Sequence, residues 1–422
     1  MEQKKKIIAI IGAGAAGCFA AINLKRFCPE ADITVYEGGR KPLAKVAITG
    51  GGRCNLTNSF CGIKSTDEAY PRGGRLMKRL LKEFSHIDTY EWFEREGVRL
   101  VTQEDGCVFP HSQDAMEIVI TLTQLMRRTG VNLKTTHRVK MIERSLDEKS
   151  DHSNGSFRIS FSDENISPCC ADAVIVTTGG SPQLSGLDML STLGHEIAAP
   201  VPSLFSVCLR DNAITELMGT VIDHVTVSLS GTKHRASGPL LVTHWGLSGP
   251  AILKLSSYAA RTLHETDYKA QLSVNWFGDK NENEVMQHIS EMATANPQKK
   301  ISTTRPSHIN SRLWLHLLSE SGLNHEQRWA ELSKKSHHKL VSTLTNNIYI
   351  IDGKNRFKEE FVTCGGVALS NIYPSTLESR KHPGLYFAGE VTDLDAITGG
   401  FNLQAAWTMG YVAAKSLAAS LS

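Results

Sequence analysis

The chain has 422 residues, of which 41% are hydrophobic and 21% are charged, and its formal net charge is +3. This length suits two or three domains, and the composition is that of a globular protein rather than a disordered one. So small a net charge does not indicate nucleic-acid binding without a local basic patch. Nine cysteines without a C-x-x-C pair fit neither a zinc ribbon nor a disulfide framework, so we expect reduced thiols and no metal site.

The N-terminus carries lysines at positions 4–6 before an apolar run, as a secretory signal would. No cleavage signature follows, however, and glycines interrupt the run before it ends in Asn23, Lys25 and Arg26. No later stretch has about 18 uncharged apolar residues, the minimum for a membrane span. We therefore expect a cytoplasmic protein without a membrane segment.

The first forty residues follow the order strand, glycine turn, helix, strand, acid. The apolar run Ile7–Ile11 leads into the G-x-G-x-x-G sequence Gly12–Gly17, and after a helical stretch a second run, Ile33–Tyr36, ends on Glu37. A G-x-G-x-x-G sequence alone is a weak signal, but here the strand, the helix and the acid are all in register with it. The stretch therefore predicts a dinucleotide-binding unit.

The residues that such a unit needs for its turn, its phosphate contacts and its ribose contact are all present. Gly12 allows the tight turn, Gly14 lets a pyrophosphate approach the backbone, and Gly17 permits close packing of helix and strand. The helix N-terminus offers free N–H groups to the phosphates, and the Glu37 carboxylate is placed to accept from a ribose 2′-OH.

A second glycine-rich loop follows at Gly50–Gly52, and it continues into Arg53, Cys54, Asn55 and Thr57. Three glycines permit close backbone approach, and an arginine can meet a phosphate through its planar fork. The alternative is an ordinary surface loop. The number of polar, short and backbone-exposing residues favours a ligand loop.

Between position 72 and the middle of the chain the patterns predict further elements of the first domain. We expect a helix over 72–96 with a basic outer face, a short strand at Gly97–Val101, a helix through Leu125 capped by Ser112, and strands at Val131–Ile142 and Phe157–Phe161 around a polar loop at Asp147–Asn154. The apolar run Ala173–Val176 then predicts a buried parallel strand. Its carboxyl end, at Thr177–Gly180, would face a ligand.

From Pro200 the pattern changes to short alternating runs that indicate an inserted antiparallel β unit. The next stretch, Glu282–Leu344, reads as mostly helical. Between Lys299 and Lys339 it holds eight Lys or Arg against three acids. The default interpretation of that excess is a solvated face, and the alternative is an RNA-binding surface. The predicted domains are 1–199 with 346–422, an inserted β domain at 200–278, and a helical insert at 279–345.

The C-terminal region returns to strands and glycines. A second buried strand runs through Gly384–Glu390, and the pair Gly399 and Gly400 precedes a helix of small residues at Ala405–Ala418. The N-terminus of that helix would favour negative charge, such as the charge at the N1/O2 edge of a reduced flavin.

Taken together, these motifs resemble the YhiN/BaiN-like family of bacterial NAD(P)/FAD-dependent flavoproteins from end to end. The matching segments are GAGAAG (12–17), KPLAKVAITGGGRCNLTN (41–58), FP (109–110), TTGG (177–180), GLSGP (246–250), CGGV (364–367) and GLYFAGEVTDLDAITGGFNLQAA (384–406). The resemblance implies an α/β fold, namely a Rossmann-like FAD-binding domain of the glutathione-reductase type. It also implies an inserted β-barrel-like domain and a helical domain.

The resemblance and the motifs together give the predicted FAD contacts. Those implied by the resemblance are Gly12, Gly14, Ala16, Glu37, Lys45, Arg53, Cys54, Asn55, Thr57, Val139, Gly179, Gly389, Glu390, Asn402 and Gln404. The motifs add Ala15, Gly17, Gly38, Gly52, Thr178, Gly180, Gly399, Gly400 and Phe401. One segment departs from the family: Ser181–Leu190 stands where a loop of the type GSTGDGY is usual, and this difference bears on substrate choice.

For the reaction, we expect NADH or NADPH to reduce FAD, and the flavin to pass a hydride to an electron-poor conjugated C=C or C=O bond. The resemblance leaves three activities open: reduction of steroid-like small molecules, reduction of a uridine of ribosomal RNA, and amine oxidation. A scaffold that binds FAD without catalysis is a further alternative. Because only one strong G-x-G-x-x-G unit is present, NAD(P)H is expected to dock transiently at the flavin.

The sequence offers few groups for proton transfer. His111 and His244 are the candidate catalytic residues, followed by Cys54 and Cys364. A lone histidine is more often structural than catalytic, so these assignments depend on geometry.

Overall fold

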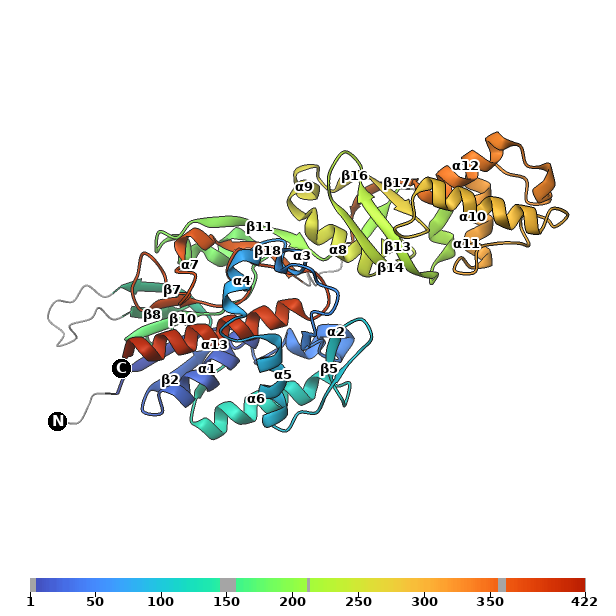
Figure 1. Cartoon of the computed structure of the whole chain (residues 1–422). Coiled ribbons are helices and arrows are strands. Elements are labelled where there is room, and N and C mark those ends of the chain that lie inside the picture. Colours follow the sequence, from blue (N-terminus) through green and yellow to red (C-terminus); the bar gives the residue numbers. More distant parts are fainter. Residues whose placement is uncertain (1–4, 145–156, 211–212, 356–361, 422) are drawn as a thin grey trace. The chain divides into compact units, whose positions relative to one another are not determined.

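The computed structural model describes residues 5–144, 157–210, 213–355 and 362–421, and the chain divides into two compact units. Unit 1 comprises Met1–Val201 and Val362–Ser422, and unit 2 comprises Pro202–Phe361. Figure 1 shows both units, coloured along the chain.

A parallel sheet forms the centre of unit 1. Within the described ranges its strand order is β19 (Leu385–Phe387), β10 (Ala173–Val176), β1 (Ile7–Ile11), β2 (Asp32–Tyr36) and β6 (Asn132–Lys134). The chain leaves β1 toward β2 on one side, whereas β10 pairs with β1 on the other side. Such a switch point is where open α/β sheets bind ligands, outside the carboxyl ends of the strands. The expected Rossmann-like fold is confirmed.

Two long helices from opposite ends of the sequence pack together on this sheet. Helix α1 (Ala15–Phe27) lies beside α13 (Phe401–Leu421), as Figure 1 shows. A Cβ atom added at Gly410 would lie 2.7 Å from the backbone oxygen of Ala16, so the missing side chain lets the helices approach closely. Helix α13 is buried on almost every side, which explains its nearly uniform apolar sequence.

Smaller elements surround the sheet. They are the antiparallel sheets β3 (Thr57–Asn58)–β5 (Cys107–Pro110)–β4 (Leu100–Thr102) and β7 (Val139–Arg144)–β8 (Phe157–Phe161)–β9 (Cys169–Ala171), the pair β11 (Ile197–Ser203)–β18 (Val362–Val367), and the helices α2 (Thr49–Gly52), α3 (Thr66–Ala69), α4 (Gly74–Leu80), α5 (His86–Arg95), α6 (Ala115–Thr129) and α7 (Asp188–Ser191).

The helix predicted over 72–96 is wrong as a single element, because α4 and α5 are separate. Ser85 begins α5 with a capping box: its Oγ accepts from Asp88 N at 3.2 Å, and Asp88 Oδ2 accepts from Ser85 N at 2.7 Å. A capping box satisfies the free N–H groups of a new helix, so the chain turns at Leu81–Phe84 instead of continuing α4.

Three local expectations also need correction. Asp114, not Ser112, caps α6, since its carboxylate accepts from Met116 N at 2.8 Å. The strand expected over Val131–Ile142 is two strands, β6 and β7, in different sheets, because the chain bends between them. The short strand near Gly97 begins only at Leu100. The polar loop at Asp147–Asn154 lies outside the described residues.

Unit 2 contains a closed barrel of antiparallel strands. Their order is β12 (Val207–Leu209), β15 (Gly246–Ser248), β14 (Arg235–Val242), β13 (Val221–Leu229), β16 (Lys269–Asn275) and β17 (Asn347–Lys354). The predicted boundary at residue 346 would place the last strand, β17, in the FAD-binding domain, but β17 belongs to the barrel. Strand β17 pairs with β12 and β16 and closes the barrel, so the chain returns to unit 1 only at Val362.

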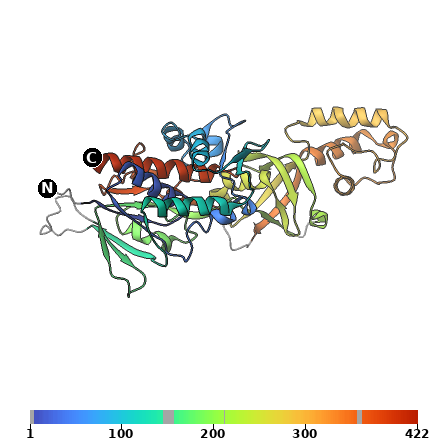
Figure 2. The same cartoon turned by 90° about the horizontal axis from the view of Figure 1, so that it is seen from below.

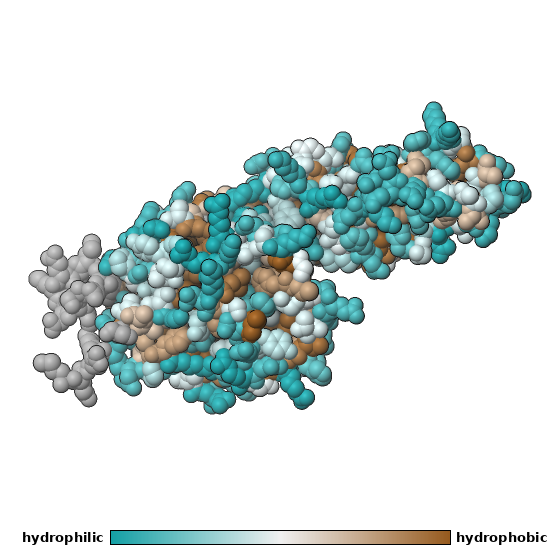
Figure 3. All heavy atoms as spheres, viewed as in Figure 1, coloured by the Kyte–Doolittle hydropathy of each residue, from teal (hydrophilic) through white to brown (hydrophobic). Residues whose placement is uncertain are grey.

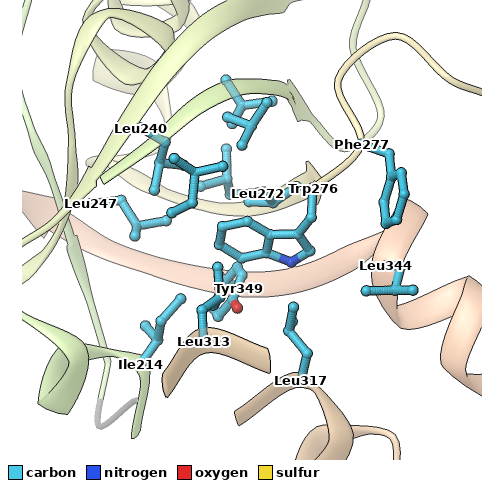
Figure 4. Close-up of a cluster of buried hydrophobic side chains, with 14 of the residues drawn as sticks. Ile214, Leu240, Leu247, Leu272, Trp276, Phe277, Leu313, Leu317, Leu344 and Tyr349 are labelled. Atoms are coloured by element: carbon cyan, nitrogen blue, oxygen red, sulfur yellow. The ribbon is translucent and has the colours of Figure 1, made fainter. Parts of the chain in front are cut away.

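Helices complete unit 2: α8 (Pro250–Tyr258), α9 (Ala260–Glu265), α10 (Glu282–Ala295), α11 (Ser311–Glu320) and α12 (Lys334–Thr345). Figure 2 shows α10 and its neighbours at one end of the barrel. Strands and helices share one core, in which Trp276 and Tyr349 pack against Leu313 and Leu317 (Figure 4). Asn347 Oδ1 accepts from Trp276 Nε1 at 3.0 Å. The division of this region into a β domain at 200–278 and a helical insert at 279–345 stays a prediction.

Candidate dinucleotide-binding site

The turn after β1 has the geometry that the glycines predict. Gly12 has φ +105°, and a Cβ atom there would lie 2.5 Å from Thr177 O. A Cβ at Gly17 would lie 2.0 Å from Gly12 O, whereas one at Gly14 would meet nothing within 4 Å. Gly12 and Gly17 are therefore steric requirements of the turn, and Gly14 leaves bare backbone in front of the helix.

No side chain of the described residues caps the N-terminus of α1 at Gly14. Its first N–H groups thus remain suited to an anion, as the prediction requires. Glu37 lies at the same end of the sheet: its Oε2 accepts from Ala13 N at 2.9 Å and its Oε1 from Gly39 N at 2.6 Å. A carboxylate can accept more than two hydrogen bonds, so Glu37 can brace the turn and still accept from a ribose.

The second glycine segment, labelled α2, is not a regular helix. The φ angles of Gly50, Gly51 and Gly52 are +59°, +68° and +82°. Arg53 returns to φ −96°, and Cys54 is again left-handed with +59°. A Cβ at Gly50 would lie 2.9 Å from Asn55 N, whereas a Cβ at Gly51 or Gly52 would meet no atom within 4 Å. The loop therefore presents bare backbone to a ligand. The exposed Arg53 guanidinium lies 4.4 Å from the centre of the Phe109 ring, and that contact fixes its direction.

Residues near 55 and near 400 form one cluster although they are far apart in the sequence. Thr57 Oγ1 donates to Gln404 Oε1 at 2.5 Å, and Asn58 Nδ2 donates to Gly399 O at 2.9 Å. With its amide oriented to satisfy both groups, Asn55 donates to Thr57 O at 3.1 Å and accepts from Gly400 N at 3.3 Å. The predicted residues of both segments are thus brought together at the N-terminus of α13.

Gly400 makes this cluster possible. Its φ is +89°, and a Cβ atom there would lie 2.3 Å from Thr57 O. Asn402 holds the preceding loop: its amide accepts from Ala396 N at 2.9 Å and donates to Ala396 O at 3.0 Å. Phe401 is buried, and its backbone oxygen accepts from Tyr70 OH at 3.0 Å.

A third group of predicted residues lies around Glu390. Its Oε1 accepts from Thr363 N at 2.7 Å, and its Oε2 lies 3.4 Å from Lys45 Nζ. A Cβ at Gly180 would lie 2.5 Å from Glu390 Oε1. The segments that follow β10 and β19, at Thr178–Gly180 and Gly389, therefore lie close to the glycine turn after β1. Gly389 lies near Ala16 at the start of α1. Gly38 lies against Arg138, which precedes the predicted contact Val139 at the start of β7.

The two histidine candidates for proton transfer belong to different units of the chain. His111 is exposed after β5 in unit 1, and His244 is exposed between β14 and β15 in unit 2. Cys54 and Cys364 are both fully buried. Burial raises the pKa of the Cys54 thiol to about 12, which keeps it protonated near neutral pH.

Sequence reasoning missed one buried ion pair, between Arg72 and Asp395. The guanidinium bonds both carboxylate oxygens, and the Asp395 side chain is 0% exposed. Burial by itself would lower the pKa of Arg72, but the hydrogen bond and charge of Asp395 outweigh it and raise that pKa. The pair ties the loop before Gly399 to the chain leading into α4. A lone arginine and a lone aspartate more than 300 positions apart gave no signal of it.

The described residues contain neither a candidate membrane-spanning helix nor a candidate metal site. No helix among them is long and apolar enough to cross a membrane. No group of three or more His, Cys, Asp or Glu side chains there could hold a metal ion.

Comparisons with known proteins agree with this geometry. The model of the HI0933-like protein Rossmann domain matches residues 6–416. The chain is 28% identical over 423 residues to a 3-dehydro-bile acid delta(4,6)-reductase of Clostridium scindens, covering 97% of this chain and 98% of that protein. It is also 28% identical over 421 residues to a ribosomal RNA dihydrouridine synthase of Escherichia coli, covering 98% of each.

Among solved structures, the 3-ketosteroid delta1-dehydrogenase of Sterolibacterium denitrificans matches with a TM-score of 0.52 and 13% identity, covering 99% of this chain and 100% of that chain. At that identity the likeness concerns the fold alone. A Cβ at Gly14, Gly51 or Gly52 would meet nothing within 4 Å, and Gly14 follows the strand at the switch point of the Rossmann sheet, which fits FAD. The chain belongs to the HI0933-like family of Rossmann-fold flavoproteins, the YhiN/BaiN-like group, and is an FAD-dependent oxidoreductase.

Proposed function

We propose that this protein uses NADH or NADPH, through bound FAD, to reduce a C=C bond conjugated to a carbonyl group. In the overall reaction one hydride and one proton add across the C=C bond, and NAD(P)H becomes NAD(P)+. Support comes from the names of the full-length relatives, because a delta(4,6)-reductase of a 3-dehydro-bile acid and a dihydrouridine synthase both add hydrogen to a C=C bond.

The observation that carries the proposal is the turn at Gly399 and Gly400, which immediately precedes α13. Asn58 Nδ2 donates a hydrogen bond to Gly399 O and holds this turn in place. Bound FAD supplies two-electron hydride chemistry. The N-terminus of α13 favours negative charge beside it, so the protein would favour the reduced state that a reductase needs.

The remaining predicted contacts take their roles from their places in unit 1. We assign the pyrophosphate to the N-terminus of α1 at Gly14 to Gly17, the ribose to Glu37, and the flavin end to Arg53 and Asn55. Gln404 is 0% exposed and bonds Thr57 and Thr408, so it supports this segment from behind. His111 and His244 remain the candidate proton donors, since both are exposed.

An anaerobic titration tests the function. The purified holoenzyme is mixed with NADH or NADPH, and flavin absorbance near 450 nm is followed before a 3-oxo-Δ4 steroid is added. Loss and then recovery of the flavin absorbance supports the proposal. A protein that holds FAD but is bleached by neither nucleotide contradicts it. His111→Gln and His244→Gln then identify the proton donor, because only the correct variant slows recovery without slowing bleaching.

Reduction of a uridine in ribosomal RNA is a second candidate, favoured by the charge of α12. Lys334, Lys335 and Lys339 are exposed, and the first turn contains no acid. Lysines at a helix N-terminus oppose the helix dipole, so their presence favours a polyanion as partner. Hydrophilic residues predominate on the visible face of unit 2 (Figure 3).

The RNA candidate is tested in cells that lack the gene. Dihydrouridine in ribosomal RNA is mapped in the deletion strain, in its parent, and in a strain that carries Lys334→Glu with Lys335→Glu. Loss of dihydrouridine in the first and third strains supports RNA as the substrate. Equal dihydrouridine in the deletion strain and its parent eliminates it.

A further inference from the structure

Unit 1 has a cavity of about 430 Å³ beside α4 that the FAD contacts do not use. Its lining includes Phe60, Ile63, Lys64, Asp67, Arg75 and Lys78. Four of these lie on the segment before and within α3, and two lie on α4. The volume lies within the range of small-ligand sites, about 300–1,000 Å³.

The cavity has an excess of positive charge. Lys64, Arg75 and Lys78 are exposed, and Asp67 is the one carboxylate in the lining. Among the described residues none of these three cations forms an ion pair, whereas the exposed Lys415 pairs with Glu83 at 2.9 Å. Three unneutralised cations around one concave site suit phosphate oxygens, which accept charge-assisted hydrogen bonds.

An aromatic wall connects this cavity to the flavin end of the site. The Phe60 ring meets the Phe401 ring edge to face, with centres 5.0 Å apart. Phe60 also has φ +58°, an unusual conformation for a bulky residue. Asn58 holds it there: Asn58 Oδ1 accepts from Phe60 N at 2.8 Å, while the same amide donates to Gly399 O. One side chain thus fixes both the cavity wall and the turn before α13.

We propose that this cavity binds the phosphate-bearing part of NADH or NADPH when the nucleotide docks to reduce the enzyme. The inference rests on the proposed function and names the site of its reductant. Lys64, Arg75 and Lys78 would bind the pyrophosphate or the 2′-phosphate, and Phe60 and Ile63 would contact a ring. The lining comes from one short stretch, residues 60–78, which favours a dinucleotide over RNA because it does not form the extended track of a polynucleotide site.

The test measures binding and flavin reduction separately, with FAD-loaded protein. Calorimetry with the unreactive NAD+ and NADP+ gives the dissociation constants. Anaerobic stopped-flow mixing with NADH and NADPH gives the concentration dependence of flavin reduction. The variants are Lys64→Ala and the double variant Arg75→Ala with Lys78→Ala. The matched control is Arg79→Ala, which removes an exposed cation of the same helix that does not line the cavity.

The double variant is expected to weaken nucleotide binding by about tenfold or more, because each charge-assisted hydrogen bond contributes on the order of tenfold. The limiting rate of flavin reduction at saturation should change little, and Arg79→Ala should bind as the wild type does. Weaker binding of NADP+ alone assigns the cavity to the 2′-phosphate. Equal weakening of NAD+ and NADP+ assigns it to the pyrophosphate.

Other results overturn the inference in distinguishable ways. If wild-type enzyme is reduced by NAD(P)H but the cavity variants bind nucleotide normally, the site is wrong and the proposed function stands. If those variants lose affinity for ribosomal RNA and keep nucleotide binding, RNA is the occupant. If the wild-type enzyme neither binds nor is reduced by either nucleotide, both the site and the proposed reductant are wrong.

Discussion

Replacing Gly400 by alanine should damage both the fold at the start of α13 and the affinity for FAD. The new Cβ would lie 2.3 Å from Thr57 O and 2.7 Å from the side-chain amide of Asn55. Thr57 cannot easily yield, because β3 is paired with β5. The positive φ of +89° adds strain for any residue with a side chain.

The magnitude follows from these two costs. A left-handed conformation costs alanine about 1–2 kcal/mol, and overpacking against backbone costs about 1–3 kcal/mol more. We therefore expect a loss of about 2–5 kcal/mol in the free energy of unfolding. If about 1.4 kcal/mol of this cost falls on the FAD-bound conformation, FAD binds about tenfold more weakly.

Urea unfolding and quenching of flavin fluorescence measure the two quantities. Gly97→Ala is the matched control: its φ is +91°, but a Cβ there meets nothing within 4 Å, so only the conformational cost of about 1–2 kcal/mol is expected. The steric reasoning is refuted if Gly400→Ala has the unfolding free energy and FAD dissociation constant of Gly97→Ala.

Three further predictions follow from buried groups. Asp395→Asn should lower the free energy of unfolding by about 3–5 kcal/mol, because it removes the buried negative charge that bonds the Arg72 guanidinium. Urea unfolding should show no comparable loss for Glu83→Gln, which breaks an exposed pair. Iodoacetamide at pH 8 should alkylate the exposed Cys61 and Cys170 but not Cys54, whose pKa is raised to about 12 by burial. Peptide mass spectrometry that finds Cys54 labelled as fast as Cys61 would contradict this prediction. Burial lowers the pKa of His195 to about 4, and the charges of His382 and Lys381 act in the same direction. The unfolded chain takes up this proton near pH 6.5 and the folded chain only near pH 4, so the free energy of unfolding should fall as the pH drops between these values. A His195→Gln variant whose free energy of unfolding falls equally steeply in urea unfolding would disprove the linkage.

The sequence was informative wherever one local segment carries the whole signal. The turn at Gly12, the acid at Glu37 and the buried strand at Ala173–Val176 could be predicted because each depends on residues within a few positions. The start of α5 was also marked locally, by Ser85 and Asp88, but the continuous apolar spacing of the neighbouring helices hid it.

Contacts across the chain could not be predicted in this way. The bond between Thr57 and Gln404 joins residues 347 positions apart, and each partner has many other plausible roles. Strand β17 was misplaced for the same reason: its alternating pattern shows a strand but not which sheet it joins. The sequence likewise shows that Gly50–Gly52 can adopt positive φ, whereas only the three-dimensional contacts show that they do.

The packing of α1 against α13 has a consequence for how the protein is made. Strand β19 and α13 follow unit 2 in the chain, and they complete the central sheet and the predicted FAD site. The N-terminal half of unit 1 must therefore wait while the contiguous segment Pro202–Phe361 is synthesised. A nascent chain that stops before Gly384 therefore lacks the predicted FAD contacts at Gly389–Gln404, however well its barrel has folded.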